Sequence, residues 1–181
     1  MQVVKRAPTR VTLRLQNDLL ENLMEEAQKR DLTLNALINR TLNRIVSYDN
    51  NVNVVQCVTM PHELFLEMIT EIPQNSIREI GKGGPRIVKK LFNILGMKYD
   101  LEHVINNYFT ILGKYCGWFE FSYKEQFGNY RLVFCAGKDP KWSTFVQAYV
   151  KNILDSLKIA PINDSMHDGI VVFEFAYKDK Q

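Results

Sequence analysis

The sequence predicts an α+β protein in which a small N-terminal unit precedes a larger α/β sandwich domain. Within the first fifty residues, the spacing of apolar residues changes from the period of a strand to that of a helix. Predicted strands and helices then follow one another along the remaining chain. A hydrophobic content of 46% over 181 residues is enough for a packed core, in one domain of moderate size or two small ones.

Positive charge is concentrated at the N-terminus, although the net charge of the whole chain is only +3. No acidic residue precedes Asp18, whereas this stretch contains four basic residues: Lys5, Arg6, Arg10 and Arg14. Such a basic arm favours contact with phosphate groups.

The cysteines and the hydropathy of the chain indicate where the protein resides. Cys57, Cys116 and Cys135 are odd in number and far apart, which favours a reducing cytoplasm over a disulfide framework. The N-terminus lacks the long apolar run of a signal peptide, and no stretch approaches the roughly 20 apolar residues of a membrane span. We therefore expect a cytoplasmic protein that makes no membrane contact.

One strand and two helices are expected in the first fifty residues. Residues 9–15 alternate between polar and apolar side chains, as in a half-buried strand. The outward residues are Arg10, Thr12 and Arg14, and the inward residues are Val11, Leu13 and Leu15. Helical spacing then predicts a helix over 17–30, capped by Asn17, and a second over 33–48, capped by Thr33.

A polar turn at 49–51 marks the expected boundary between an N-terminal domain, 1–51, and a second domain, 52–181. In the second domain the patterns first predict a strand at 52–59, a helix at 61–72, a glycine-rich loop at 81–85 and a short helix to Leu95. A helix at 100–115 follows, and then two strands, at 117–125 and 130–136, joined through Gly128–Asn129. The last predicted elements are a helix starting at Asp139–Pro140 and a strand at 169–177. This order suits a split βαβ, ferredoxin-like sandwich with extra helices, in which helices cover one face of an antiparallel sheet.

The first strand needs a partner strand. Its backbone N–H and C=O groups need hydrogen-bond partners, and its apolar face must be covered, which one strand alone cannot provide. No other strand is expected before residue 52. Pairing with the same strand of a second chain gives an antiparallel ribbon across a two-fold axis. Its outward face would present Arg10, Thr12 and Arg14 twice, and a two-stranded ribbon with such side chains fits the DNA major groove.

The segment 9–47 resembles the ribbon-helix-helix family of Arc and MetJ type repressors. The resemblance rests on the strand Arg10-Val-Thr-Leu-Arg-Leu15, the first helix, and Leu32-Thr-Leu-Asn35 opening the second helix. It covers about a quarter of the chain. It implies that Arg10, Thr12 and Arg14 read bases, and that Thr33, Leu34 and Asn35 anchor a DNA phosphate. A helix N-terminus has the free N–H groups for that role.

Two positions depart from the family pattern. Gln16 stands where many members have proline after the strand, and Arg30–Asp31 stands where many have glycine between the helices. Aspartate tolerates turn geometry, so the fold is not threatened, although its charge opposes a nearby phosphate.

The expected function is that of a homodimeric, sequence-specific transcriptional regulator of double-stranded DNA, associated with the nucleoid. Lys5 and Arg6 would join the phosphate contacts, and the second domain would assemble dimers into larger oligomers or sense a small-molecule effector. An antitoxin or a segregation-type DNA-binding protein is one alternative. The other is a ligand- or protein-binding module whose N-terminal unit only dimerises, with the outward strand residues as a solvated face.

Weaker patterns each have an ordinary structural interpretation. The segment Gly81–Arg86 suggests a phosphate loop, but it lacks the Gly-Lys-Ser/Thr ending and favours an interhelical loop, with Arg86, Lys89 and Lys90 available to flanking DNA. The aromatic residues between Tyr108 and Tyr149 suit a ligand pocket or, more simply, a core.

Neither catalysis nor cofactor binding is expected. No Ser-His-Asp order, carboxylate pair or zinc spacing stands out. The nickel-responsive members of the resembled family use closely spaced histidines plus a cysteine. Here His62, His103 and His167 lie far apart, so we expect no metal, cofactor or enzymatic activity.

Overall fold

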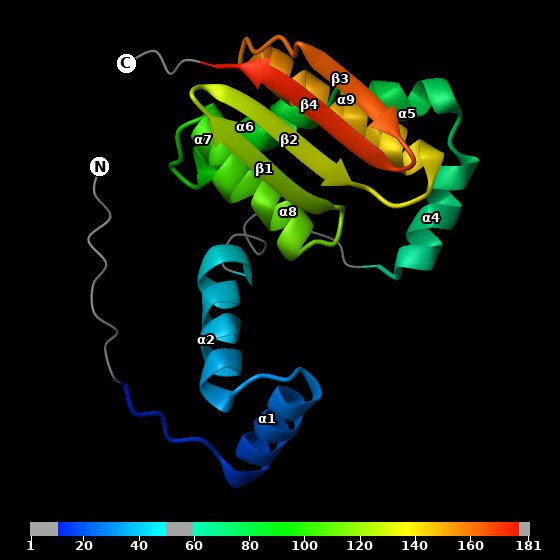
Figure 1. Cartoon of the computed structure of the whole chain (residues 1–181). Coiled ribbons are helices and arrows are strands. Elements are labelled where there is room, and N and C mark those ends of the chain that lie inside the picture. The colour runs from blue at the N-terminus through cyan, green and yellow to red at the C-terminus, as the bar shows by residue number, and fades with distance from the viewer. Residues whose placement is uncertain (1–10, 50–59, 178–181) are drawn as a thin grey trace. The chain divides into compact units, whose positions relative to one another are not determined.

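The computed structural model describes residues 11–49 and 60–177 (Figure 1). The chain divides into two compact units, Met1–Val46 and Ser47–Gln181, which are described separately below. The strand expected at 52–59 lies outside the described residues, as do Lys5, Arg6 and Arg10.

The first unit consists of two helices, α1 (Asn17–Lys29) and α2 (Leu34–Arg44). Residues 11–16 belong to no helix or strand of the single chain, so the predicted intermolecular strand stays a prediction. The expected cap of α1 was wrong by one residue. Gln16 is the N-cap, its side chain makes no capping hydrogen bond, and Asn17 is already helical.

The turn between α1 and α2 is a Schellman motif. The N–H of Leu32 donates to the carbonyl oxygen of Ala27 at 2.9 Å, and the N–H of Asp31 donates to that of Gln28 at 3.1 Å. Asp31 has a φ of 53°, in the left-handed region that glycine usually fills. The expectation that aspartate accepts this turn geometry is confirmed.

The helix expected at 33–48 is α-helical only to Arg44 and continues as a π-helical segment, η1 (Ile45–Asp49). Thr33 caps it as predicted, because its Oγ1 accepts a hydrogen bond from the N–H of Ala36 at 3.2 Å.

The described part of the second unit is rich in helices. They are α4 (His62–Glu71), α5 (Gln74–Gly81), α6 (Gly84–Ile94), α7 (Leu101–His103), η2 (Val104–Phe109), α8 (Thr110–Lys114) and α9 (Pro140–Ser156). The helices predicted at 61–72 and 100–115 are confirmed, the latter with a π-helical middle. Asp139 caps α9 as expected, accepting from the N–H of Trp142 at 2.7 Å.

The glycine-rich loop predicted at 81–85 is a shorter interhelical turn, and the short helix predicted after it is confirmed as α6. Gly81 ends α5 and Gly84 begins α6, which leaves only Lys82 and Gly83 between the two helices. Both helical glycines permit close packing on α9: a Cβ atom on Gly81 would lie 2.8 Å from the Cβ of Ala148, and one on Gly84 would lie 3.1 Å from Tyr149. Tertiary packing, rather than chain flexibility, explains these glycines.

The sheet contains four antiparallel strands in the order β1-β2-β4-β3. Their bounds are β1 (Glu120–Gln126), β2 (Asn129–Cys135), β3 (Asn163–His167) and β4 (Ile170–Ala176). The β1–β2 hairpin and β4 were predicted, whereas β3 was not. The hairpin turn was misplaced by one residue: it is Phe127–Gly128, where both φ angles are positive, and Asn129 is already paired with Gln126.

The ferredoxin-like order is not confirmed. That order would place the strand expected at 52–59 between β2 and β4, but these two strands pair directly, with Leu132 opposite Phe173. A split βαβ unit does form from other strands. Because β4 is antiparallel to both β2 and β3, those two strands run parallel, with α9 connecting them and β4 between them.

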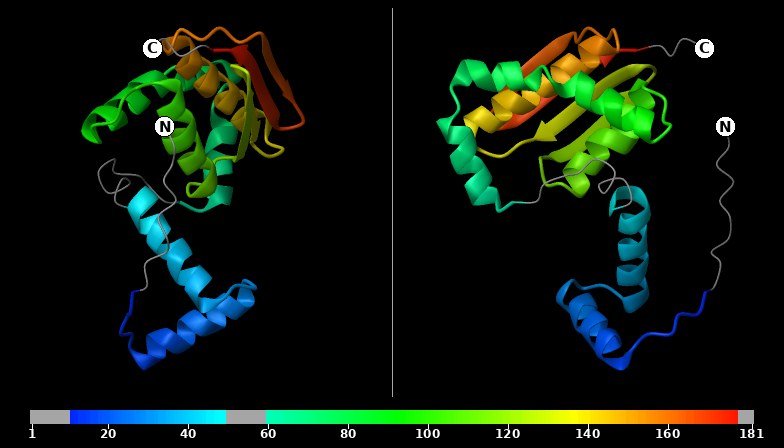
Figure 2. Two further views of the ribbon diagram at one scale, coloured as in Figure 1. Left: turned by 60° about the vertical axis from the view of Figure 1, so that its left-hand side comes forward. Right: turned by 180° about the vertical axis from the view of Figure 1, so that it is seen from behind.

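The helices gather on one face of the sheet, and α9 lies between the sheet and the α5–α6 pair (Figures 1 and 2). Nine of the seventeen residues of α9 are buried, as expected for a helix covered on several sides. Lys141 anchors the chain before α5, donating from Nζ to the carbonyl oxygens of Thr70 and Ile72 at the end of α4.

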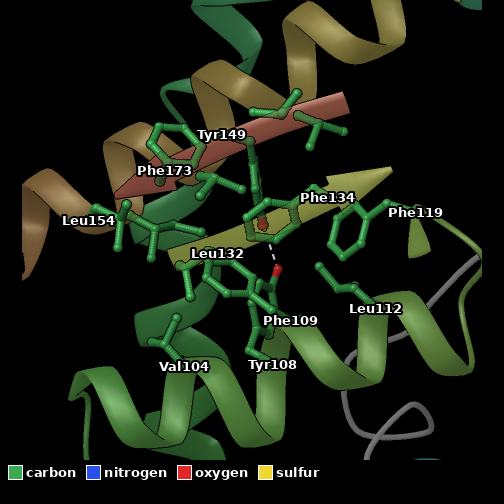
Figure 3. Close-up of a cluster of buried hydrophobic side chains, with 14 of the residues drawn as sticks. Val104, Tyr108, Phe109, Leu112, Phe119, Leu132, Phe134, Tyr149, Leu154 and Phe173 are labelled. Atoms are coloured by element: carbon green, nitrogen blue, oxygen red, sulfur yellow. Dashed lines mark hydrogen bonds between the residues drawn. The ribbon is translucent and has the colours of Figure 1, made fainter. Parts of the chain in front are cut away.

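The core is dominated by aromatic side chains. Phe134 packs edge to face against Phe109 and Phe119, with ring centroids 5.2 Å and 5.0 Å apart (Figure 3). The Tyr108 and Tyr149 hydroxyl groups meet at 2.5 Å inside it, and burial raises the pKa of Tyr149 to about 12. Of the two interpretations of the aromatic residues, a packed core is therefore the one observed.

Candidate nucleic-acid interface

The segment that precedes α1 places polar and apolar side chains in solvent together. Thr12 and Arg14, two of the three expected base-reading residues, are exposed. The apolar residues between them are exposed as well: Val11 by 73% and Leu13 by 53%. Removing these side chains from water requires a surface beyond the residues described for this unit.

The helices of the first unit also lack a complete core. Only Ala27 and Leu37 are buried hydrophobic residues among the described part of this unit. The large hydrophobic residues exposed there are Val11, Leu13, Leu15, Leu19, Met24, Leu42, Ile45 and Val46. Two buried side chains cannot offset the conformational entropy of ordering some thirty residues, so this unit needs a further apolar surface to be stable.

The N-terminus of α2 brings the predicted phosphate-binding residues together. Thr33 uses its hydroxyl group to cap the N–H of Ala36. The N–H groups of Leu34 and Asn35 donate to no acceptor among the residues that the structure describes. No acidic residue lies in the first turn of α2. Two free N–H groups at the positive end of a helix dipole can bind an anion, as the sequence predicts.

Side-chain hydrogen bonds link successive turns of α2 behind this end. Asn39 donates from Nδ2 to the carbonyl oxygen of Asn35 at 2.9 Å and to its Oδ1 at 3.2 Å. The Asn35 side chain therefore already accepts one hydrogen bond, while its N–H group remains available. Any anion contact by Asn35 would use its donors, the backbone N–H or the side-chain Nδ2, because the side-chain oxygen can only accept.

The second unit has a basic surface that the sequence interpretation assigned only in part. Arg86, Lys89 and Lys90, expected on the short helix after the glycine-rich loop, lie along the exposed side of α6. Arg78, on α5, was not singled out, because α5 itself was missed. The signal for α5 was Pro73 followed by Ile77 and Gly81 at helical spacing, which suits a short helix packed through one narrow face.

The remaining candidates do not converge on a chemical site. Cys135 is a free thiol, and no cluster of three or more metal-ligating side chains occurs within 11–49 and 60–177. The ring of His103 is hydrogen-bonded to the carboxylate of Asp100, with 2.6 Å between Nδ1 and Oδ1. Burial of Asp100 is outweighed by hydrogen bonds from the backbone and ring of His103, so the pKa of Asp100 is lowered.

Over the described ranges, no helix combines the length and the apolar character needed to cross a bilayer. Compared with known proteins, the chain matches no family model, no curated protein and no solved structure, so the likeness of residues 9–47 to the ribbon-helix-helix family rests on its own motifs.

Proposed function

We propose that the chain is a homodimeric, sequence-specific DNA-binding regulator. In this proposal the segments 9–15 of two chains pair as an antiparallel ribbon and enter the major groove. Arg10, Thr12 and Arg14 contact bases, and the start of α2 holds a phosphate. The second unit assembles dimers or senses an effector.

The observation that carries the proposal is the apolar surface of the first unit. Among the described residues of this unit, eight large hydrophobic residues are exposed and two hydrophobic residues are buried. Three of them, Val11, Leu13 and Leu15, alternate with polar residues before α1. A second copy can cover this pattern, because the inward faces of two paired strands then pack on four helices.

The polar positions of the same segment support DNA as the partner. Thr12 and Arg14 alternate with the apolar residues, so pairing that buries Leu13 leaves them on the opposite face. Arginine binds guanine O6 and N7 with two hydrogen bonds, and threonine can contact a thymine methyl group. The free N–H groups of Leu34 and Asn35 add a contact that fixes position on the backbone without reading sequence.

The test compares two full-length variants for sequence preference. The parent and each variant are mixed with a genomic fragment pool at two salt concentrations, and the retained fragments are sequenced. We expect the parent to recover a short, nearly palindromic motif. Arg14→Ala should lose about 1–3 kcal/mol of discrimination at one base position in each half-site. Arg40→Ala, which removes an exposed arginine from α2, serves as the matched control.

Two results would contradict the proposal. One is a parent that retains all fragments alike and releases them at the higher salt, since only the phosphate contribution would then be present. The other is Arg14→Ala with the same motif and affinity as the parent, which would remove the base-reading role of the ribbon.

The folded second unit favours a regulator over an antitoxin whose tail folds on a toxin. That unit has its own core, built from the sheet, α9 and the helices before it. A segment that depends on a partner for its structure would not bury so many side chains alone.

A further inference from the structure

The α5–α6 pair carries a basic surface, the α5–α6 basic face, defined by Arg78, Lys82, Arg86, Lys89 and Lys90. All five side chains are exposed. The only acidic residue within 74–94 is Glu79, and its carboxylate pairs with Lys82 at 2.6 Å. The remaining four cations are not neutralised by carboxylates in the described ranges.

The packing of α6 fixes the direction of this face. Val88 and Phe92 are buried in the core, one turn apart. Arg86 and Lys90, also one turn apart, therefore lie on the side that faces away from the core. Lys89 lies at the margin, with its Nζ 5.1 Å from the centre of the Tyr99 ring. Seen from behind, α5 and α6 form the outer layer of the unit, beyond α9 (Figure 2).

The distribution of charge sets this face apart from the rest of the chain. Residues 74–94 contain five basic residues and one acidic residue, and residues 1–16 contain four basic residues and none that is acidic. Everywhere else, fourteen basic residues stand against nineteen acidic ones. An otherwise acidic protein thus carries two positive segments, one at the proposed DNA-reading arm and one on α5–α6.

We infer that the α5–α6 basic face binds the phosphate backbone of double-stranded DNA, and this inference rests on the proposed function. The cations of this face are spaced by about one helical turn, and the one acidic neighbour is already neutralised. Such a row of positive charge is complementary to a polyanion that presents a phosphate every few ångströms. The face contributes affinity without reading sequence, whereas the N-terminal ribbon supplies the sequence preference.

The chemistry of α6 favours DNA over a membrane surface. A helix that lies in a bilayer interface inserts its main apolar face. In α6 that face, with Val88 and Phe92, is buried in the protein core. Ile87 and Ile94 are only about half exposed, 44% and 49%, and form a narrow strip beside the cations.

The test uses the full-length protein and a matched pair of double variants. Arg86→Gln with Lys90→Gln removes two cations from the basic face. Lys124→Gln with Lys138→Gln removes two exposed lysines, from β1 and from the loop before α9, as the control. Dissociation constants are measured over a salt series, on a duplex containing the recovered motif and on an unrelated duplex of equal length.

We expect the α6 variant to bind both duplexes more weakly by the same factor, more than about tenfold near 0.1 M salt. The slope of log affinity against log salt should flatten by about 0.9 for each phosphate that the variant no longer neutralises. The control should keep the slope of the parent. The preference for the motif should be unchanged in both variants.

The outcomes separate this inference from the proposed function. A parent that prefers the motif, together with an α6 variant of unchanged slope, overturns the inference and leaves the proposed function in place. A parent without sequence preference, together with a flattened slope in the α6 variant, supports the inference and overturns sequence-specific regulation. Binding to phosphatidylserine vesicles that is absent in the α6 variant, with an unchanged DNA slope, assigns the face to a membrane and overturns the inference.

Discussion

The two units of the chain bury their apolar residues in different ways. In the second unit, 25 hydrophobic residues form one buried cluster, and the fully buried side chains include Phe92, Phe109, Phe134 and Phe173. In the first unit, two hydrophobic residues are buried and eight large ones are exposed among the described residues. The stability of the second unit therefore lies within one chain, whereas the apolar residues of the first would be covered only in the proposed dimer.

The largest effect is expected from a core substitution that destabilises the second unit and leaves the first unchanged. Phe134 is fully buried and packs edge to face against Phe109 and Phe119. Phe134→Ala should lower the free energy of unfolding by about 3–5 kcal/mol, because it removes buried apolar surface and leaves a cavity. Urea denaturation followed by tryptophan fluorescence measures this, because Trp118 and Trp142 belong to this unit. A decrease below about 1 kcal/mol would contradict the described core.

A comparable effect concerns the response of the second unit to alkali. Burial raises the pKa of Tyr149 to about 12, against about 10 in an unfolded chain. A raised pKa means that the neutral form is favoured in the folded state. The stabilisation is complete below pH 10 and is lost as pH rises from about 10 to about 12, by about 3 kcal/mol.

Denaturation curves at pH 9, 10 and 11 measure this decrease. Tyr149→Phe should remove the part of this decrease that Tyr149 contributes. It should also lower stability at pH 7, since the Tyr108 hydroxyl group would lack its partner at 2.5 Å. An unchanged pH profile in Tyr149→Phe would show that the decrease arises elsewhere.

A smaller effect concerns the helix cap in the first unit. Thr33→Ala removes the cap of α2 and should cost about 1 kcal/mol of stability in that unit. Thr33→Ser keeps a hydroxyl group at the same position and should retain most of that stability. Thermal unfolding monitored by circular dichroism distinguishes the two variants. Equal destabilisation in both would contradict the capping role.

The smallest effect concerns the left-handed turn at Asp31. Asp31→Gly should stabilise the first unit by less than about 1 kcal/mol, because glycine adopts a φ near 53° without strain. Asp31→Ala should not. Differences in thermal midpoint measure both changes, and a destabilised glycine variant would contradict the Schellman geometry.

Sequence patterns predicted the elements that carry strong local signals. Asp139–Pro140 indicated the start of α9, Thr33 indicated that of α2, and the alternation of Val171, Phe173 and Phe175 predicted β4. These signals act within a few residues, so no knowledge of the tertiary fold is needed to recognise them.

The missed elements depend on tertiary packing. β3 has little apolar alternation because it lies at the sheet edge, where Asp164 instead accepts hydrogen bonds from Gln147 and Lys151 of α9 at 2.7 Å each. α5 contains a glycine, Gly81, whose lack of a Cβ atom allows α9 to pass close to it. The pairing of β2 with β4 likewise depends on how all the strands assemble into the sheet. The order of elements along the chain was therefore not enough to test a ferredoxin-like order of strands across the sheet.

The candidate site was predictable where it depends on alternation and capping. The cap at Thr33 follows from residues within four positions of it, as the hydrogen bond from Ala36 shows. The outward position of Arg14 stays a prediction, because residues 11–16 form no strand within the single chain. The basic face of α5–α6 was not predictable as a unit, because it exists only when the segment around Gly81 and Gly84 is helical.

Dimerisation through the N-terminal segment is tested by the oligomeric state of the full-length protein, measured by sedimentation equilibrium for the parent and for Leu13→Asp. We predict a parent dimer at micromolar concentration. Leu13→Asp should be a monomer with an intact second unit, because pairing would bury two carboxylates in the apolar face of the ribbon. A monomeric parent, or a Leu13→Asp variant that remains as dimeric as the parent, would contradict the proposed ribbon.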